Sequence, residues 1–180
     1  MQTIFYGARY KGHRSTCSAP VAAAFAFLAF CQPASAETAI ERGRYLVTIG
    51  GCNDCHTPGY FLGKPDPERF LGGSDVGFFV PELGAFVGPN LTADKETGLG
   101  TWSQDDIVTA LQTGVTPDGR ELAPIMPWRA FAELKTSDAH AIAAFLKSLP
   151  IVKHKVAGPF GPDESLPIPV LKVVAPGAAQ

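Results

Sequence analysis

The chain has 180 residues, 46% of them hydrophobic, and a formal net charge of −2. A chain of this length and composition can bury one substantial core. The weakly acidic balance argues against nucleic acid as a partner, because proteins that bind nucleic acid display basic surfaces.

The first 36 residues have the features of a secretory signal peptide. Three cations and no acid precede Glu37, and the apolar run APVAAAFAFLAF is followed by the small-residue motif ASA. We predict cleavage before Glu37 and export to the periplasm. The apolar run is too short to span a bilayer, so we expect no stable membrane span after cleavage; an uncleaved N-terminal anchor is the alternative. Cys17 and Cys31 would leave with the signal, which excludes a disulfide framework.

Residues 38–51 are predicted to hold the first helix. Thr38 and Glu41 have the spacing of a capping box, which satisfies free backbone N–H groups at a helix start. Gly43 lies on the same face as the apolar Leu46. A glycine inside a helix costs about 1 kcal/mol relative to alanine. Gly43 is therefore either a tolerated weak point or a place where another helix comes close.

The sequence GGCNDCHTPG follows, and its CxxCH pattern is the signature of covalent haem attachment. In that chemistry Cys52 and Cys55 each add a thiol across a haem vinyl group, and His56 coordinates the iron. The two residues between the cysteines let one turn of chain span the two vinyl positions. We therefore predict one covalently attached haem c with His56 as the proximal ligand.

Two other chemistries use a closely spaced cysteine pair. A structural zinc site needs four nitrogen or sulfur ligands, and only His140 and His154 are further candidates, without a second CxxC. A thioredoxin-like dithiol would follow a strand in a βαβ unit, whereas this motif follows a predicted helix. A free vicinal pair would also tend to oxidise in an exported protein. Haem attachment is therefore the favoured chemistry.

Residues 57–102 are rich in Gly, Pro and Phe and are predicted to be a long loop, in which DVGFFVPELGAFVG is a candidate short hairpin. A stretch of this length without regular structure is unusual unless it has a function. Its aromatic side chains either wrap an apolar ligand or make a small satellite core. A second helix is predicted over residues 103–114, with Ser103 as its N-cap and Gly114 as its stop.

Met126 is the only methionine after the signal peptide, and Pro124 and Pro127 bracket it. Haem iron in electron carriers commonly has a second axial ligand from the protein, and we predict Met126 in that position. A methionine that fills a gap in the core and a substitute ligand at His154 are the alternatives. His/Met ligation raises the reduction potential and leaves no coordination position open, which indicates one-electron transfer rather than catalysis.

The third predicted helix, TSDAHAIAAFLKSLP, has a wide apolar stripe and ends at Pro150. Thr136 or Ser137 is the expected N-cap, and His140 is expected on the surface. Residues 151–180 are rich in Pro and Gly and are expected to form an irregular tail.

The order of these features resembles a single-haem class I cytochrome c: capped helix, CxxCH, long loop, second helix, Met loop and final helix. The resemblance covers roughly residues 38–150. It implies an all-α fold, with a cytochrome c-like helical domain over residues 37–150 and a long loop insertion after the haem-attachment motif. It also implies that the first and last helices cross at Gly43, close to Phe145.

A closer likeness lies in GPNLTADKETGLGTWSQDDI and DGRELAPIMPW, which are similar to haem domains in cytochrome subunits of bacterial membrane-bound alcohol and sugar dehydrogenases. Those subunits commonly carry three haems, whereas this sequence has one CxxCH. It also has Trp128 where tyrosine commonly follows Met-Pro. The family likeness implies that the carbonyl of Pro89 accepts the proximal imidazole N–H. It also makes Arg120, Trp102 and Trp128 candidates for contact with the haem.

We therefore expect a periplasmic one-electron carrier, not an enzyme, that exchanges electrons transiently with a donor and an acceptor protein. A haem subunit of a periplasmic dehydrogenase complex is one alternative, and a five-coordinate haem enzyme or sensor is another. His56 and Met126 would bind the iron, and the cofactor-binding residues would be Cys52, Cys55, His56, Met126 and Pro89.

Overall fold

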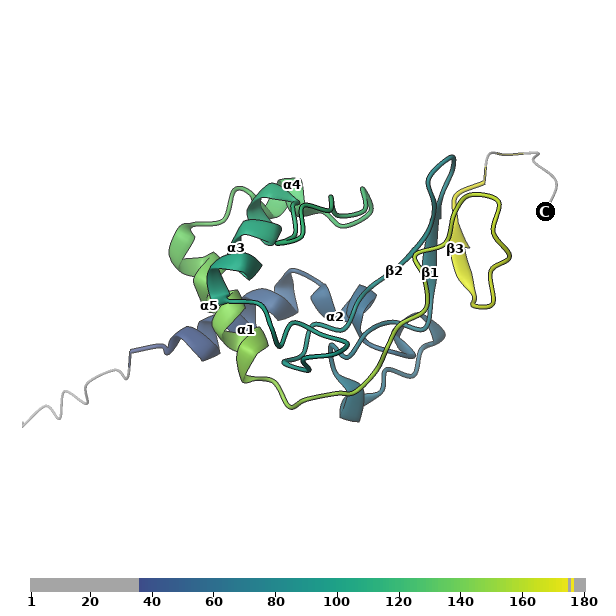
Figure 1. Cartoon of the computed structure of the whole chain (residues 1–180). Coiled ribbons are helices and arrows are strands. Elements are labelled where there is room, and N and C mark those ends of the chain that lie inside the picture. Colours follow the sequence, from purple (N-terminus) through teal and green to yellow (C-terminus); the bar gives the residue numbers. More distant parts are fainter. Residues whose placement is uncertain (1–35, 175, 177–180) are drawn as a thin grey trace, which may run out of the picture. The chain divides into compact units, whose positions relative to one another are not determined.

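A group of helices and a small β-sheet make up the fold (Figure 1). The computed structural model describes residues 36–174 and 176. The predicted signal peptide therefore lies outside the described residues, except for Ala36. Within the described part of the chain, no helix is both long and apolar enough to cross a membrane.

Three helices carry most of the core: α1 (Ala39–Ile49), α3 (Gln104–Thr113) and α5 (Thr136–Ser148). These are the three helices that the sequence predicts. Shorter pieces connect them, namely α2 (Cys52–His56), η1 (Tyr60–Leu62), η2 (Pro67–Arg69) and α4 (Trp128–Phe131).

The ends of the helices follow from local side chains. Thr38 and Ser103 each accept a hydrogen bond from the backbone three residues on and complete a reciprocal capping box. Gly114 ends α3 in the left-handed conformation, with φ of 74°. The predicted cap of α5 is wrong, because Thr136 is already the first helical residue. Lys135 occupies the N-cap position without a side-chain hydrogen bond.

Three short strands form a sheet in the order β2-β1-β3: β1 (Gly77–Val80), β2 (Gly84–Val87) and β3 (Val170–Lys172). The β1–β2 pair is the antiparallel hairpin suggested by the sequence, whereas β3 comes from the tail and runs parallel to β1. The expectation of an all-α fold is therefore wrong, and the fold is mixed α/β. The three-residue β3 gives too little alternation to be recognised, and it pairs with a strand far away in the sequence.

The crossing of α1 and α5 has no room for a side chain at Gly43. A Cβ built there would lie 2.7 Å from the Cβ of Phe145 and would overlap the carbonyl oxygen of Ala141. The family resemblance implied this contact, and the structure confirms it. Glycine at position 43 lowers the helix propensity of α1, but its missing side chain allows the backbones of α1 and α5 to come together.

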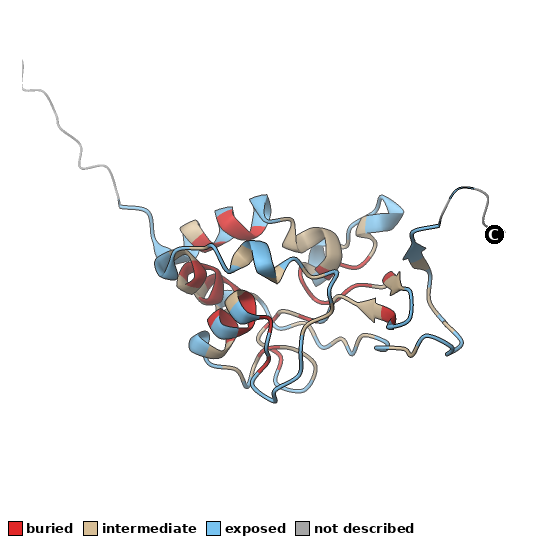
Figure 2. Ribbon diagram, turned by 90° about the horizontal axis from the view of Figure 1, so that it is seen from above, coloured by how far each residue is buried: buried red, intermediate tan, exposed pale blue. Residues whose placement is uncertain are grey.

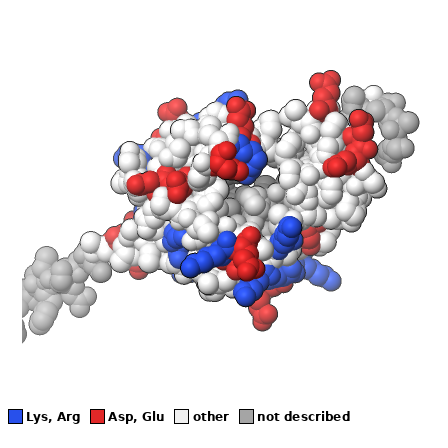
Figure 3. All heavy atoms as spheres, viewed as in Figure 1, with Lys and Arg blue, Asp and Glu red and all other residues white. Residues whose placement is uncertain are grey.

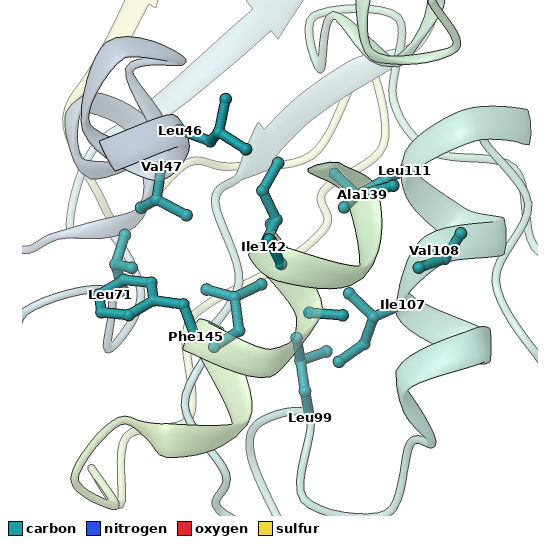
Figure 4. Close-up of a cluster of buried hydrophobic side chains, with 13 residues drawn as sticks. Leu46, Val47, Leu71, Leu99, Ile107, Val108, Leu111, Ala139, Ile142 and Phe145 are labelled. Atoms are coloured by element: carbon teal, nitrogen blue, oxygen red, sulfur yellow. The ribbon is translucent and has the colours of Figure 1, made fainter. Parts of the chain in front are cut away.

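One hydrophobic cluster joins the three long helices (Figure 4). Leu46 and Val47 come from α1, Ile107 and Leu111 come from α3, and Ile142 and other side chains of α5 lie between them. Figure 2 shows the buried residues concentrated on the facing sides of these helices, with exposed residues on their outer sides. The amphipathic stripes of the three helices therefore make one core.

Replacing Gly43 by alanine is expected to lower the free energy of unfolding by about 3 kcal/mol, because overpacking must push the two helices apart. Denaturant unfolding measures the effect. Gly161→Ala is the control, since a Cβ there meets only the Glu164 side chain at ordinary contact distances of 3.7–3.8 Å. A Gly43→Ala variant as stable as the control would show that the close crossing does not limit stability.

Candidate haem-binding site

The CxxCH motif forms its own single turn of helix, α2. Gly51 precedes it in the left-handed conformation with φ of 66°, which turns the chain sharply after α1. Cys52 and Cys55 are three residues apart on this turn, so their side chains lie on one face. Both thiols line the same cavity as His56. The local sequence thus gives the geometry that two adjacent thioether bonds require.

His56 is buried and held by the backbone of a distant loop. Its Nδ1 lies 2.8 Å from the carbonyl oxygen of Pro89. Because a carbonyl oxygen can only accept, Nδ1 carries the proton and donates it. Burial lowers the pKa of His56 and keeps the imidazole neutral. Nε2 then holds the free electron pair that a metal ligand needs.

The loop that carries Pro89 lies directly against the motif. A Cβ at Gly88 would overlap the carbonyl oxygen of Cys55 and lie 3.3 Å from Nδ1 of His56. The next residue, Asn90, is almost fully buried, with 1% of its surface exposed. Its amide donates to the carbonyl oxygen of Val152 at 2.6 Å and accepts from the Thr92 N–H at 2.9 Å. These contacts fix the position of the Pro89 carbonyl.

The electrostatics of the two thiols weigh against the alternatives to haem. Burial raises the pKa of Cys52 to about 11 and also raises the pKa of Cys55. A redox dithiol works through a thiolate with a lowered pKa, so these cysteines are poorly suited to that chemistry. Among the residues that the structure describes, no three His, Cys, Asp or Glu side chains gather as a metal site would require, which argues against zinc.

Met126 reaches the same cavity from the segment between α3 and α4. Its backbone N–H donates to the carbonyl oxygen of Ala123 at 2.9 Å, and its own carbonyl accepts from Trp128 at 2.8 Å. These bonds, with a proline on either side of the Ile125–Met126 pair, make a tight turn. A thioether therefore lines a cavity that the imidazole also lines, although the two residues are far apart in the sequence.

The cavity has a volume of about 260 Å³ and mainly apolar walls. Of the described residues that line it, only Arg120 is a Lys, Arg, Asp or Glu. This donor set fits a haem c: two thiols for attachment, one imidazole and one thioether for the iron, apolar walls for the ring and one guanidinium for a carboxylate. The apolar walls come from Phe78, Phe86, Val87, Leu91, Leu99, Trp102, Ile107, Ala110, Leu111, Leu122, Ile125, Ile142 and Leu146.

Three residues raised by the sequence lie outside the cavity. His154 instead bonds the carbonyl oxygen of Gly72 through Nδ1 at 2.7 Å. Trp128 packs over Gly114, where a Cβ would lie 2.5 Å from its ring. His140 is partly exposed, 3.9 Å from the carboxylate of Asp105. None of the three lines the cavity, so His154 is not arranged as an iron ligand.

Sequence reasoning missed two of the cavity's aromatic residues, Phe78 and Phe86 on the hairpin. The clustering of Phe and Gly in the long loop is consistent both with a role around an apolar ligand and with a small satellite core. No sequence signal distinguishes these two side chains from the neighbouring Phe79, because the distinction depends on which face of a short strand meets the cavity.

Lys147 secures another part of the cavity wall. Its ammonium, in the last turn of α5, donates three hydrogen bonds. The acceptors are the carbonyl oxygens of Leu99, Gly100 and Trp102, at 3.1, 3.2 and 2.9 Å. Leu99 and Trp102 both line the cavity. All the donors of Lys147 are thus used to hold this loop against the helix.

Comparison with known proteins gives several relatives that are named as cytochrome subunits of dehydrogenases. The chain is 35% identical over 113 residues to the fructose dehydrogenase cytochrome subunit of Gluconobacter japonicus. It is 33% identical over 109 residues to the cytochrome c subunit of the alcohol dehydrogenase (quinone) of Gluconobacter oxydans. This part of the chain is similar to cytochrome c subunits of dehydrogenases. The resemblance expected from the sequence motifs is confirmed.

The alignments cover only part of this chain and a smaller part of each relative. These two alignments each cover 61% of this chain but only 22% and 21% of the relatives. A diheme cytochrome c-type protein of Cereibacter sphaeroides is 40% identical over 118 residues, which is 63% of this chain and 36% of that protein. No protein-family model matches the chain. The chain thus spans about a fifth to a third of the length of these relatives.

Replacing Lys147 by methionine is expected to lower the free energy of unfolding by about 1–3 kcal/mol, because the carbonyls of the 99–102 loop lose a charged donor. Thermal or denaturant unfolding measures the loss. Lys155→Met removes an exposed lysine of the tail and should change stability by less than about 0.5 kcal/mol. Equal stability of the two variants would show that the three hydrogen bonds contribute nothing.

Proposed function

We propose that this protein is a periplasmic electron-transfer protein that carries one covalently attached haem c with His56 and Met126 on the iron. The observation that carries the proposal is the meeting of the CxxCH turn and Met126 in one apolar cavity. The similarity to cytochrome c subunits of dehydrogenases supports it independently. The haem would supply the one-electron chemistry by alternating between ferrous and ferric iron.

The residues of this chain would tune that chemistry. The Pro89 carbonyl fixes the tautomer and orientation of His56. A soft thioether at Met126 favours the ferrous state and so raises the reduction potential. His56 and Met126 would together hold the iron and would leave no coordination position for a substrate, so the haem would supply electron transfer rather than catalysis.

Service as the cytochrome subunit of a dehydrogenase complex is the second candidate, because the names of the relatives state that role for them. Electrostatics would orient any redox partner, whether transient or stable. Figure 3 shows Lys and Arg concentrated along the lower part of one face, and Asp and Glu mainly over its upper part. Such local patches steer docking more than the formal charge of −2 does. Stable co-purification with a dehydrogenase would favour the second candidate.

Covalent attachment is tested with a Cys52→Ser, Cys55→Ser double variant produced in a periplasm competent for haem attachment. We expect the wild type to keep haem through denaturing electrophoresis and the double variant to lose it, because no thiol remains to add to a vinyl group. Met126→Ala is the matched control and should keep its haem, since ligation is separate from attachment. A wild type without covalent haem would refute the proposal.

The axial ligand is tested by optical spectroscopy of the oxidised protein. We expect a thioether-to-iron charge-transfer band in the wild type and its complete loss in Met126→Ala. The reduced variant should also bind carbon monoxide, because one coordination position becomes open. His154→Gln is the control and should retain the band. Prompt binding of carbon monoxide by the reduced wild type would instead support the five-coordinate enzyme or sensor.

A further inference from the structure

The β1–β2 hairpin forms one wall of the haem cavity. Phe78 on β1 and Phe86 on β2 are cross-strand partners, and both line the cavity. Successive side chains of a strand point to opposite faces, so Phe79 faces away from this wall. There the ammonium of Lys172 lies 4.8 Å from the centre of the Phe79 ring. The hairpin therefore turns one aromatic pair towards the cavity and a different aromatic residue away from it.

Aromatic contacts brace this wall from the side. The ring of Phe61 meets the ring of Phe78 edge to face, with centroids 5.4 Å apart and an interplanar angle of 82°. Tyr60 meets Phe61 in the same way at 5.5 Å. Edge-to-face contacts of this kind are favourable and restrict the rotation of Phe78. The Phe78 ring thus packs against Phe61 as well as lining the cavity.

The tail holds the hairpin along both outer edges. On the β2 edge, Ala85 and Phe160 exchange two backbone hydrogen bonds of 2.9 Å. On the β1 edge, β3 pairs in parallel, and the N–H of Gly77 donates to the carbonyl oxygen of Pro169 at 3.0 Å. His154 anchors the same tail through its 2.7 Å bond to Gly72. The hairpin is therefore clamped at both edges.

We propose that the β1–β2 hairpin is the water-excluding cover of the haem, with Phe78 and Phe86 as its inner face and the tail as its clamp. The inference rests on the proposed haem attachment. Burial and low polarity around a haem disfavour its more highly charged ferric form and so raise the reduction potential. The two phenylalanines would therefore contribute to the potential without touching either axial ligand bond.

The test compares midpoint potentials of the haem-loaded full chain, measured by equilibration with redox mediators. In a Phe78→Ala, Phe86→Ala variant, water would enter beside the haem. We expect the equilibrium constant for reduction to fall about tenfold, which is 59 mV for a one-electron couple. Phe79→Ala is the matched control, since it removes the same side chain from the other face of the same strand, and its potential should equal that of the wild type.

Single Phe78→Leu and Phe86→Leu variants keep apolar bulk and decide the question where the double variant does not fold. Each should lower the potential by less than the double variant, with the charge-transfer band retained. Phe79→Leu is the control for these single variants, and potentials equal to that of the control would overturn the inference. A change in the rate of electron exchange with a partner at unchanged potential would also overturn it, because the hairpin would then be a docking surface. A wild type that attaches no haem would refute the proposed function instead.

Discussion

The close crossing of α1 and α5 at Gly43 is the constraint on which the site depends. The CxxCH turn follows α1 after Gly50 and Gly51, so the position of α1 determines where His56 lies. The other helix of the crossing, α5, supplies Ile142 and Leu146 to the cavity wall. Because protein interiors are close-packed, a displacement of one helix is transmitted to its neighbours. The contact at Gly43 thus sets the distance between the attachment motif and the opposite wall.

Loops that are tied to the helical core complete the site. The Pro89 loop is held by the buried amide of Asn90, and the 99–102 loop is held by the ammonium of Lys147. Asn90 is buried, and a buried polar group is costly unless it is bonded. Lys147 is half-buried and uses three ammonium hydrogen bonds on its loop. Each side chain therefore restricts the arrangement of its loop. Long irregular segments can in this way present a carbonyl or an apolar side chain to a cofactor with little freedom of movement.

The hairpin and the tail add a β layer to a helical core. Its strands are too short to be stable alone, and they depend on one another for backbone hydrogen bonds. The tail that crosses both edges of the hairpin also lies against the segment between η2 and β1, where His154 meets Gly72. The chain after α5 is therefore part of the structure around the cavity, and its Pro and Gly content reflects an extended path rather than an absence of contacts.

The sequence by itself determined the three long helices, two of their N-caps, the stop of α3 at Gly114, and the attachment motif, because each of these depends on residues within a few positions of one another. It also singled out Met126 and Pro89, one by its rarity and its prolines and the other by family resemblance, and both line the cavity. Only the tertiary structure decided the mixed α/β fold, the cavity role of Phe78 and Phe86, and the three-carbonyl contact of Lys147. Those features join segments far apart in the chain, and no local pattern encodes which face of a strand, or which loop, a side chain will meet.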